Sequence, residues 1–376
     1  MTFTNAKKLF SKVKWKRYTA YIVVAALFAV VLLLDAVNVL NATNSRYMML
    51  VAVYAVMTVS LNLVVGVLGE LSLGHAGFIA VGAYAGALVS KVLAATLPSA
   101  VYFPISMIAG GLVAAVFGIV IGLPVLRLKG DYIAIVTLAF CMIIYTALTN
   151  LDFTGGASGL KDIPTVTTYI NAFIVLLLSL IVIQNFVRSK HGRAIMAIRD
   201  NEIAARACGI NITYYKLFAF TLSAFIAGVG GCLYAHTSSI LKPVSMDYNL
   251  SIEILVMVVL GGMGSMTGSF ISAAILTLLP EYLRFLQDYR MIIYAVVLIL
   301  IMIVNNNSVL KGYKDRFFAW CRGCLRRWRE KAKNKAVATE GAECAPPTEE
   351  GDNAPLPPMA EVDETALNDT ERKGEK

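Results

Sequence analysis

Apolar residues of this chain come in long runs separated by short polar stretches. Between Tyr18 and Asn307 each run covers about 18 to 25 residues, the length that an α-helix needs to cross the ~30 Å hydrocarbon core of a bilayer. The runs lack the polar outer stripe that a surface helix of a soluble protein carries. The pattern therefore predicts an all-α, polytopic bundle of transmembrane helices.

We predict about ten spans within a transmembrane domain of residues 18–307. The first run follows a basic stretch and could instead be a secretory signal peptide, but it is longer than the apolar part of such a peptide. The eighth run is too short to cross alone, unless the Gly261-Gly262 segment extends it or the helix breaks within the membrane. The spans cover residues 18–38, 46–66, 70–92, 103–123, 131–150, 168–187, 214–235, 249–262, 264–283 and 290–307.

Basic residues gather in segments that alternate spans place on one side of the membrane. They are the N-terminal stretch 1–17, the loop at about 188–213 and the stretch 308–335 after the last span. Because cytoplasmic loops carry the excess of Lys and Arg, this distribution predicts an N-in, C-in topology.

The chain after the last span divides in two. Residues 308–335 are basic and contain Trp320 and Trp328, as expected of a segment that lies on anionic membrane lipid. Residues 336–376 are acidic, rich in Pro and nearly free of aromatic residues, so they cannot bury enough apolar surface to fold. We therefore expect a basic juxtamembrane segment followed by a disordered tail.

Composition narrows the possible functions. The chain is 58% hydrophobic and only 15% charged, against about 25% charged residues in soluble domains. It has no G-x-x-x-x-G-K-[ST] phosphate loop and no H-E-x-x-H motif, so we expect no enzyme activity and an energy source outside the chain. The Cys321-x-x-Cys324 pair could be half a zinc site or a redox pair, but it lacks a second pair or a nearby His, so no metal site is expected. We also expect no cofactor bound by this chain and no nucleic-acid partner.

The loop at 188–213 has the signals of a short helix over residues 200–209. Asp200 is a good N-cap, and Glu202 suits the positive first turn and forms an i,i+4 pair with Arg206. Gly209 is expected at the position after the helix. The small residues Ala204, Ala205 and Ala207 would let this helix fit a groove of a partner, although an ordinary interfacial helix explains the same pattern.

Two glycine-dense stretches, residues 66–78 and 261–268, are predicted to break helices at membrane depth. Such breaks are tolerated mainly where the backbone lines a cavity or is buried in protein. Close helix packing through small residues, with a buried hydrogen bond, explains them equally well. The candidate residues for a translocation path or hinge are Gly69, Ser72, Gly74, His75, Thr137, Gly261 and Gly264.

A third candidate is the Gly- and Ser-rich segment between the fifth and sixth spans. Alternation places it outside, where a flexible loop could contact a delivering protein or cover a pathway, though a plain loop is the commoner explanation. Its candidate residues are Thr154, Gly155, Gly156 and Ser158.

Together these segments resemble the LivM-type permease subunits of branched-chain amino acid ABC importers. The likeness runs in order from about residue 46 to residue 305. The matching motifs are Ser72-Leu-Gly-His-Ala-Gly-Phe78, Asp131-Tyr-Ile-Ala-Ile-Val-Thr-Leu138, Thr154-Gly-Gly-Ala-Ser-Gly-Leu160, Ala197-Ile-Arg-Asp-Asn-Glu-Ile-Ala-Ala-Arg-Ala-Cys-Gly-Ile210, Ala224-Phe-Ile-Ala-Gly-Val-Gly-Gly231 and Gly261-Gly-Met-Gly-Ser-Met-Thr-Gly268.

The resemblance implies a permease subunit of the bacterial inner membrane for leucine, isoleucine and valine, or, in similar permeases, for urea, amides or other amino acids. It implies an assembly with a homologous second permease, two cytoplasmic subunits that bind ATP and Mg, and an extracytoplasmic substrate-binding protein. The helix at 200–209 would couple to the ATPases through Arg199, Asp200, Glu202, Ala205 and Gly209.

Two other classes stay open from the residues. An ion-coupled secondary transporter would need carboxylates within the membrane, for which Glu70, Glu253 and Glu281 are candidates near span ends. A membrane scaffold would work through its basic tail.

Overall fold

The computed structural model describes residues 42–128 and 130–282, with the single positions 24, 28, 295, 296 and 299. Five predicted features therefore lie outside the described residues, apart from those single positions. They are the N-terminal stretch 1–17, the spans at 18–38 and 290–307, the basic segment 308–335 and the tail 336–376.

The described chain is helical, and the β-type pairing among its described residues is one isolated antiparallel bridge between Leu160 and Leu241. The long helices are α3 (Ala42–Asn62), continued by the π-helical η2 (Leu63–Leu68), α4 (His75–Leu93), α5 (Ser99–Val125), α6 (Tyr132–Asn150), α7 (Tyr169–Arg188), α10 (Ile212–Ala235), α11 (Tyr248–Gly261) and α12 (Met266–Tyr282). The shorter elements are α8 (Lys190–Asp200), α9 (Glu202–Ala207), η3 (Asp152–Thr154), η4 (Gly156–Ser158) and η5 (Pro243–Met246).

Within the described residues, 7 helices are long and apolar enough to cross a bilayer, and the shorter apolar helix Met266–Pro280 follows them. These helices fall on the second to ninth predicted spans. The eighth span gains its length at its start, because η5 and α11 form one apolar stretch, Pro243–Gly261. It does not gain it from Gly262, whose φ of 88° ends α11. The chain is thus a multi-pass membrane protein.

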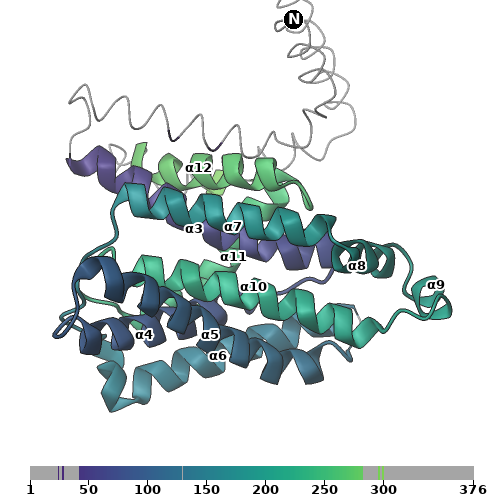
Figure 1. The fold of residues 1–376 in the computed structure, drawn as a ribbon, viewed down its shortest axis with the longest axis horizontal. Coiled ribbons are helices and arrows are strands. Elements are labelled where there is room, and N and C mark those ends of the chain that lie inside the picture. The colour runs from purple at the N-terminus through teal and green to yellow at the C-terminus, as the bar shows by residue number, and fades with distance from the viewer. Residues whose placement is uncertain are drawn as a thin grey trace, which may run out of the picture. The chain divides into compact units, whose positions relative to one another are not determined.

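Close backbone contacts hold α4, α5 and α10 together. Because Gly82 and Gly228 have no side chains, α4 and α10 meet backbone to backbone, and a Cβ on Gly82 would collide with Gly228. A Cβ on Gly228 would also lie 2.8 Å from the carbonyl oxygen of Gly110 in α5. Figure 1 shows α10 running between α5 on one side and α7 on the other. Small residues let helices approach closely where lipid provides no hydrophobic drive to pack.

The connections between helices gather at two opposite ends of this bundle, as Figure 1 shows. We call one the α9 end, where the connection from η2 to α4, the helices α8 and α9, and the turn from α11 to α12 lie. The other is the η5 end, where Leu160 of the α6–α7 connection pairs with Leu241 of the α10–α11 connection. This separation is what alternating spans require.

Candidate functional site

The predicted helix over 200–209 corresponds to the shorter α9, and a second helix, α8, ends directly before it. Asp200 does not cap it, which corrects the prediction: Asp200 is the last residue of α8, and Asn201 is the N-cap of α9. Asn201 has the extended backbone that a cap needs, with φ of −158°, and its side-chain oxygen accepts a hydrogen bond from the amide of Ala204 at 3.0 Å. The sharp bend between α8 and α9 follows from this extended residue.

The end of α9 is as predicted. Gly209 has a φ of 80° and directly follows the C-cap Cys208. The amide of Gly209 donates to the carbonyl of Arg206 at 3.0 Å, and the amide of Ile210 donates to that of Ala205 at 3.1 Å. A left-handed glycine therefore closes the helix.

The side chains of α9 divide into an inner and an outer face. Ala205 is buried against Ile198 and Ile212, so its methyl group packs within this protein. The prediction that Ala205 faces a partner is therefore wrong. Ala204 and Ala207 are exposed, and Ile203 is 83% exposed. The outer face of α9 therefore carries small and apolar side chains beside the exposed Arg206, on a helix that protrudes at one end of the bundle (Figure 1).

Arg199 ties α8 to the break after α3. Its Nη1 donates to the carbonyl oxygen of Gly66 at 2.9 Å, within η2. Its aliphatic part covers Gly69, where a Cβ would lie 2.6 Å from Cγ of Arg199. Asp200 accepts from Nε and Nη2 of Arg199 at 3.2 and 3.1 Å and so orients the guanidinium group. The predicted residues of two distant motifs thus meet here.

A lysine that sequence reasoning did not single out forms a second tie. Nζ of Lys216 in α10 lies 2.6 Å from Oε1 of Glu70 and 3.3 Å from Oε2 of Glu202. Arg206 also approaches Glu202, with its Nη2 3.4 Å from Oε1. The available signal was a charged residue inside an apolar run, since such residues are costly in a membrane and need a partner.

The two glycine-dense stretches meet at the same end. A Cβ on Gly66 would collide with the backbone of Gly264. The amide of Gly264 donates to the side-chain oxygen of Asn62 at 2.8 Å, at the junction of α3 and η2. Gly261 lies against Gly268 so closely that a Cβ would be 2.5 Å from the carbonyl carbon of Gly268. Both predicted breaks are therefore packed against each other.

The helix before the first break ends in a π turn. The amide of Gly69 donates to the carbonyl of Val64 at 2.9 Å, five residues back, and that of Glu70 contacts the same oxygen at 3.3 Å. Gly69 then leaves the helix with a φ of 84°. π turns are rare and occur frequently at functional sites.

Most of the other path candidates near the first break have packing roles. Nε2 of His75 is 2.7 Å from Oγ of Ser60, which itself donates to the carbonyl of Met57. The hydroxyl of Thr137 accepts from the amide of Leu73 at 3.1 Å. For His75 and Thr137 the structure thus favours the interpretation as buried hydrogen-bonded residues.

Ser72 and Gly74 complete this set. A Cβ on Gly74 would collide with the carbonyl of Thr137, so α4 starts in direct backbone contact with α6. The hydroxyl of Ser72 is buried and has no hydrogen-bond partner among the described residues. Ser72 is the one member of the set whose polar atom the packing leaves unexplained.

The candidate external segment is folded, which corrects the expectation of a flexible loop. The hydroxyl of Thr154 donates to the carbonyls of Leu148 and Leu151, at 2.8 and 2.6 Å, and closes the end of α6. Gly155 and Gly156, with φ of 81° and 58°, turn the chain, and Ser158 is exposed. The segment is then fixed to the α10–α11 connection by the bridge at Leu160.

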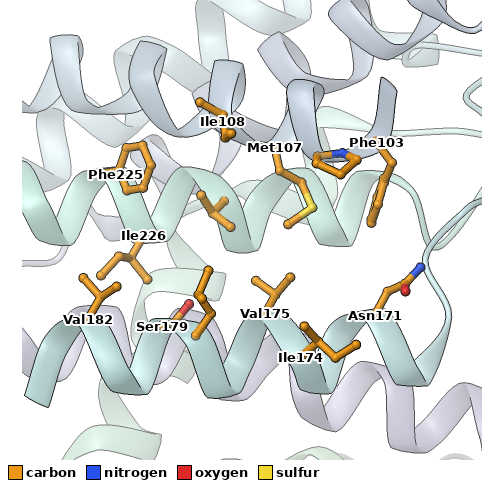
Figure 2. Close-up of a pocket in the computed structure, with 13 residues that line it drawn as sticks. Phe103, Met107, Ile108, Asn171, Ile174, Val175, Ser179, Val182, Phe225 and Ile226 are labelled. Atoms are coloured by element: carbon orange, nitrogen blue, oxygen red, sulfur yellow. The ribbon is translucent and has the colours of Figure 1, made fainter. Parts of the chain in front are cut away.

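An apolar cleft of about 340 Å³ lies between α5, α7 and α10. Figure 2 shows side chains from all three helices around it, with Met107, Val175 and Phe225 among them. The polar side chains in its lining are Asn171 and Ser179. No predicted site residue lines it.

Among the described residues, no three His, Cys, Asp or Glu side chains lie together as metal ligands would.

Comparison with known proteins identifies the family. Residues 43–302 match the family model described as the branched-chain amino acid transport system / permease component. The high-affinity branched-chain amino acid transport system permease protein LivM of Salmonella typhimurium is 35% identical over 293 residues, covering 69% of this chain and 68% of the relative. LivM of Escherichia coli strain K12 is also 35% identical, over 296 residues with the same shares.

A more distant relative is the ribose import permease protein RbsC of Haemophilus influenzae, 25% identical over 291 residues, or 72% of this chain and 85% of the relative. No solved structure matches the chain. The resemblance in the motifs is confirmed along the same stretch of sequence. The chain therefore belongs to the family of permease components of branched-chain amino acid transport systems.

Proposed function

We propose that this chain forms part of the translocation pathway of an ATP-driven importer for leucine, isoleucine and valine, in the bacterial inner membrane. Its partners would be a homologous second permease, two ATP-binding subunits and an extracytoplasmic substrate-binding protein. The observation that carries the proposal is the protruding helix α9, whose neighbour α8 is tied through Arg199 to the carbonyl of Gly66 in the broken helix.

The proposed topology has about ten spans with both termini in the cytoplasm. Eight of its spans correspond to α3 through α7 and α10 through α12 of the described chain. It places the α9 end in the cytoplasm, where the basic loop at 188–213 belongs, and the η5 end outside. The first and tenth spans rest on the sequence pattern alone.

In this arrangement the ATP-binding subunits dock on the outer face of α9. Ile203, Ala204 and Ala207 offer a small apolar surface for a groove in the partner. A shift of α9 moves α8, and Arg199 carries that movement to the π turn and to the packed glycines of both breaks. At the η5 end, the folded segment around Thr154 would meet the binding protein.

The test is uptake by the assembled complex. The chain is co-purified with the second permease and the ATP-binding subunits encoded with it, reconstituted in vesicles, and supplied with the binding protein and labelled leucine. We expect uptake that requires ATP and is competed by isoleucine and valine, but not by urea or amides.

A matched pair of variants tests the pathway of coupling. Arg199→Ala removes the tie to Gly66 and should abolish most uptake while the ATP-binding subunits still co-purify. Arg193→Ala is the same change on the same helix at an exposed residue, and it should transport normally. Uptake that continues without ATP and stops with a proton uncoupler would replace the importer by an ion-coupled transporter.

A further inference from the structure

We propose that Lys216 is a positioning residue of the transport cycle, a fixed cation that joins the start of α9 to the segment after η2. It holds Glu202 of the one and Glu70 of the other at the same time. The proposal rests on the proposed function and assigns a role to a residue that the motifs leave unassigned.

The burial of Lys216 requires the two carboxylates. Its side chain is only 8% exposed, and that of Glu70 is 16% exposed. A buried ammonium group is unfavourable unless it is paired and hydrogen-bonded, so the cation favours positions in which a carboxylate stays close to it. The resulting attraction acts on both α9 and the segment after η2.

The element that carries Lys216 is the most extensively packed of the three. Lys216 lies in the second turn of α10, which packs against α3, α4 and α5 through buried residues of its whole length. Glu202 is the first residue of α9. Glu70 follows η2, and its own amide contacts the carbonyl of Val64 in the π turn. Lys216 therefore lies on a well-packed helix, between two short segments at the α9 end.

The two halves of this contact are not equivalent. Glu202 is 35% exposed and has a second cation within reach, Arg206, which is 72% exposed. Glu202 can therefore leave Lys216 and remain paired. Among the described residues, Glu70 forms an ion pair with Lys216 alone. The distance of 2.6 Å is shorter than the 3.3 Å between Lys216 and Glu202. We infer that the contact opens at Glu202 when α9 moves, while Glu70 stays bound.

The experiment measures labelled leucine taken up per ATP hydrolysed, with the full complex in vesicles. Glu202→Gln keeps the size of the side chain and weakens only the half that opens. We expect normal co-purification of the ATP-binding subunits and an unchanged melting temperature, with a several-fold lower ratio of leucine to ATP. Arg193→Gln, the control on the neighbouring helix α8, should keep the ratio within about twofold, because the guanidinium of Arg193 bonds to the carbonyl of Arg188 and all pairs of Lys216 remain.

Two further variants separate coupling from folding. Lys216→Met should lower the ratio more than Glu202→Gln, and Lys216→Arg, which keeps the charge, should restore most of it. The double variant Glu70→Lys with Lys216→Glu reverses the pair between these two residues. It should be expressed at the normal level but keep a low ratio of leucine to ATP, since Glu202 then faces a carboxylate.

A normal ratio in Glu202→Gln overturns the proposal, even if Lys216→Met fails to fold. The proposed function would still stand in that case, because the unchanged chain would still import leucine at the expense of ATP. Absence of ATP-driven uptake by the unchanged chain would instead remove the proposed function itself.

Discussion

Single residues at the α9 end show two kinds of constraint. Gly209 is constrained by its own backbone, since its φ is 80° and a Cβ there would meet nothing within 4 Å. Gly66 is constrained by its surroundings, because a Cβ would collide with Gly264. A side chain can therefore be added at Gly209, but not at Gly66, without changing a packing contact.

Replacing Gly209 therefore tests the shape of the end of α9 alone. Gly209→Val should cost roughly 1 kcal/mol or more of local backbone free energy and lower ATP-driven uptake. Gly209→Asn is the control, because Asn tolerates the left-handed conformation. We expect near-normal uptake from Gly209→Asn and reduced uptake from Gly209→Val, with equal amounts of both in the membrane. Equal uptake from the two variants would show that α9 does not act through its shape.

The distance along the chain decides which of these residues could be predicted. Gly209 is signalled by the helix that it ends, a few residues away, and the prediction of its place is confirmed. The pair of Lys216 with Glu70 joins residues 146 positions apart, and no local pattern points from one to the other. The cap of α9 could be predicted only to within one residue. Asp200 and Asn201 are both good N-cap residues, and Asn201 is the cap because the chain bends there after α8.

Among the elements, the long helices could be placed from their apolar runs because each run must match the thickness of the bilayer. The π turn of η2 could not, since it depends on Gly69, Asn62 and the turn from α11 to α12 packing around it. How the helices pack was signalled only in part. Glycines marked close approach, but which helices they join depends on pairs such as Gly82 with Gly228.

Two glycines of α10 allow a matched test of that packing. Gly228→Ala places a Cβ 2.5 Å from Cβ of Ala114 and 2.8 Å from the carbonyl of Gly110. Gly230→Ala makes the same change two residues on, where the nearest atom is Cγ of Met57 at 3.1 Å, part of a flexible side chain. We expect Gly228→Ala to lower stability in detergent by about 1–3 kcal/mol.

Gly230→Ala should change stability by less than about 1 kcal/mol, because the side chain of Met57 can shift to accept the new Cβ. Both variants gain the same helix propensity, so the difference between them reports packing alone. Thermal unfolding of the two purified variants, followed in the same detergent, compares them directly. If the order of the two variants were reversed, the contact between α10 and α5 would not control the stability of the bundle.

At the scale of the whole molecule, the C-terminal segment can be tested separately from the helical bundle. Residues 336–376 lie outside the described structure, and their composition predicts no packed domain. Truncation after Lys335 should therefore leave the rate of uptake near that of the full chain. The measurement is leucine uptake normalised to the amount of protein in the membrane. A lost rate at normal abundance would mean that the tail binds a partner.

The two ends of the bundle allow the proposed topology to be tested. Cys208 is exposed beside α9, and Ser158 is exposed in the folded segment at the η5 end. If the basic loop at 188–213 is cytoplasmic, these two residues lie on opposite sides of the membrane. A single-cysteine chain that keeps Cys208 should resist a membrane-impermeant maleimide in spheroplasts and react only after permeabilisation.

The matched chain replaces every native cysteine and carries Ser158→Cys, which should react before permeabilisation. Both chains must first show normal leucine uptake, so that the labelling reports the working fold. Rapid labelling of Cys208 in intact spheroplasts would reverse the orientation. It would also place α9 outside the cytoplasm, away from any ATP-binding subunit. Arg199 and Lys216 could then have no role in coupling to ATP hydrolysis.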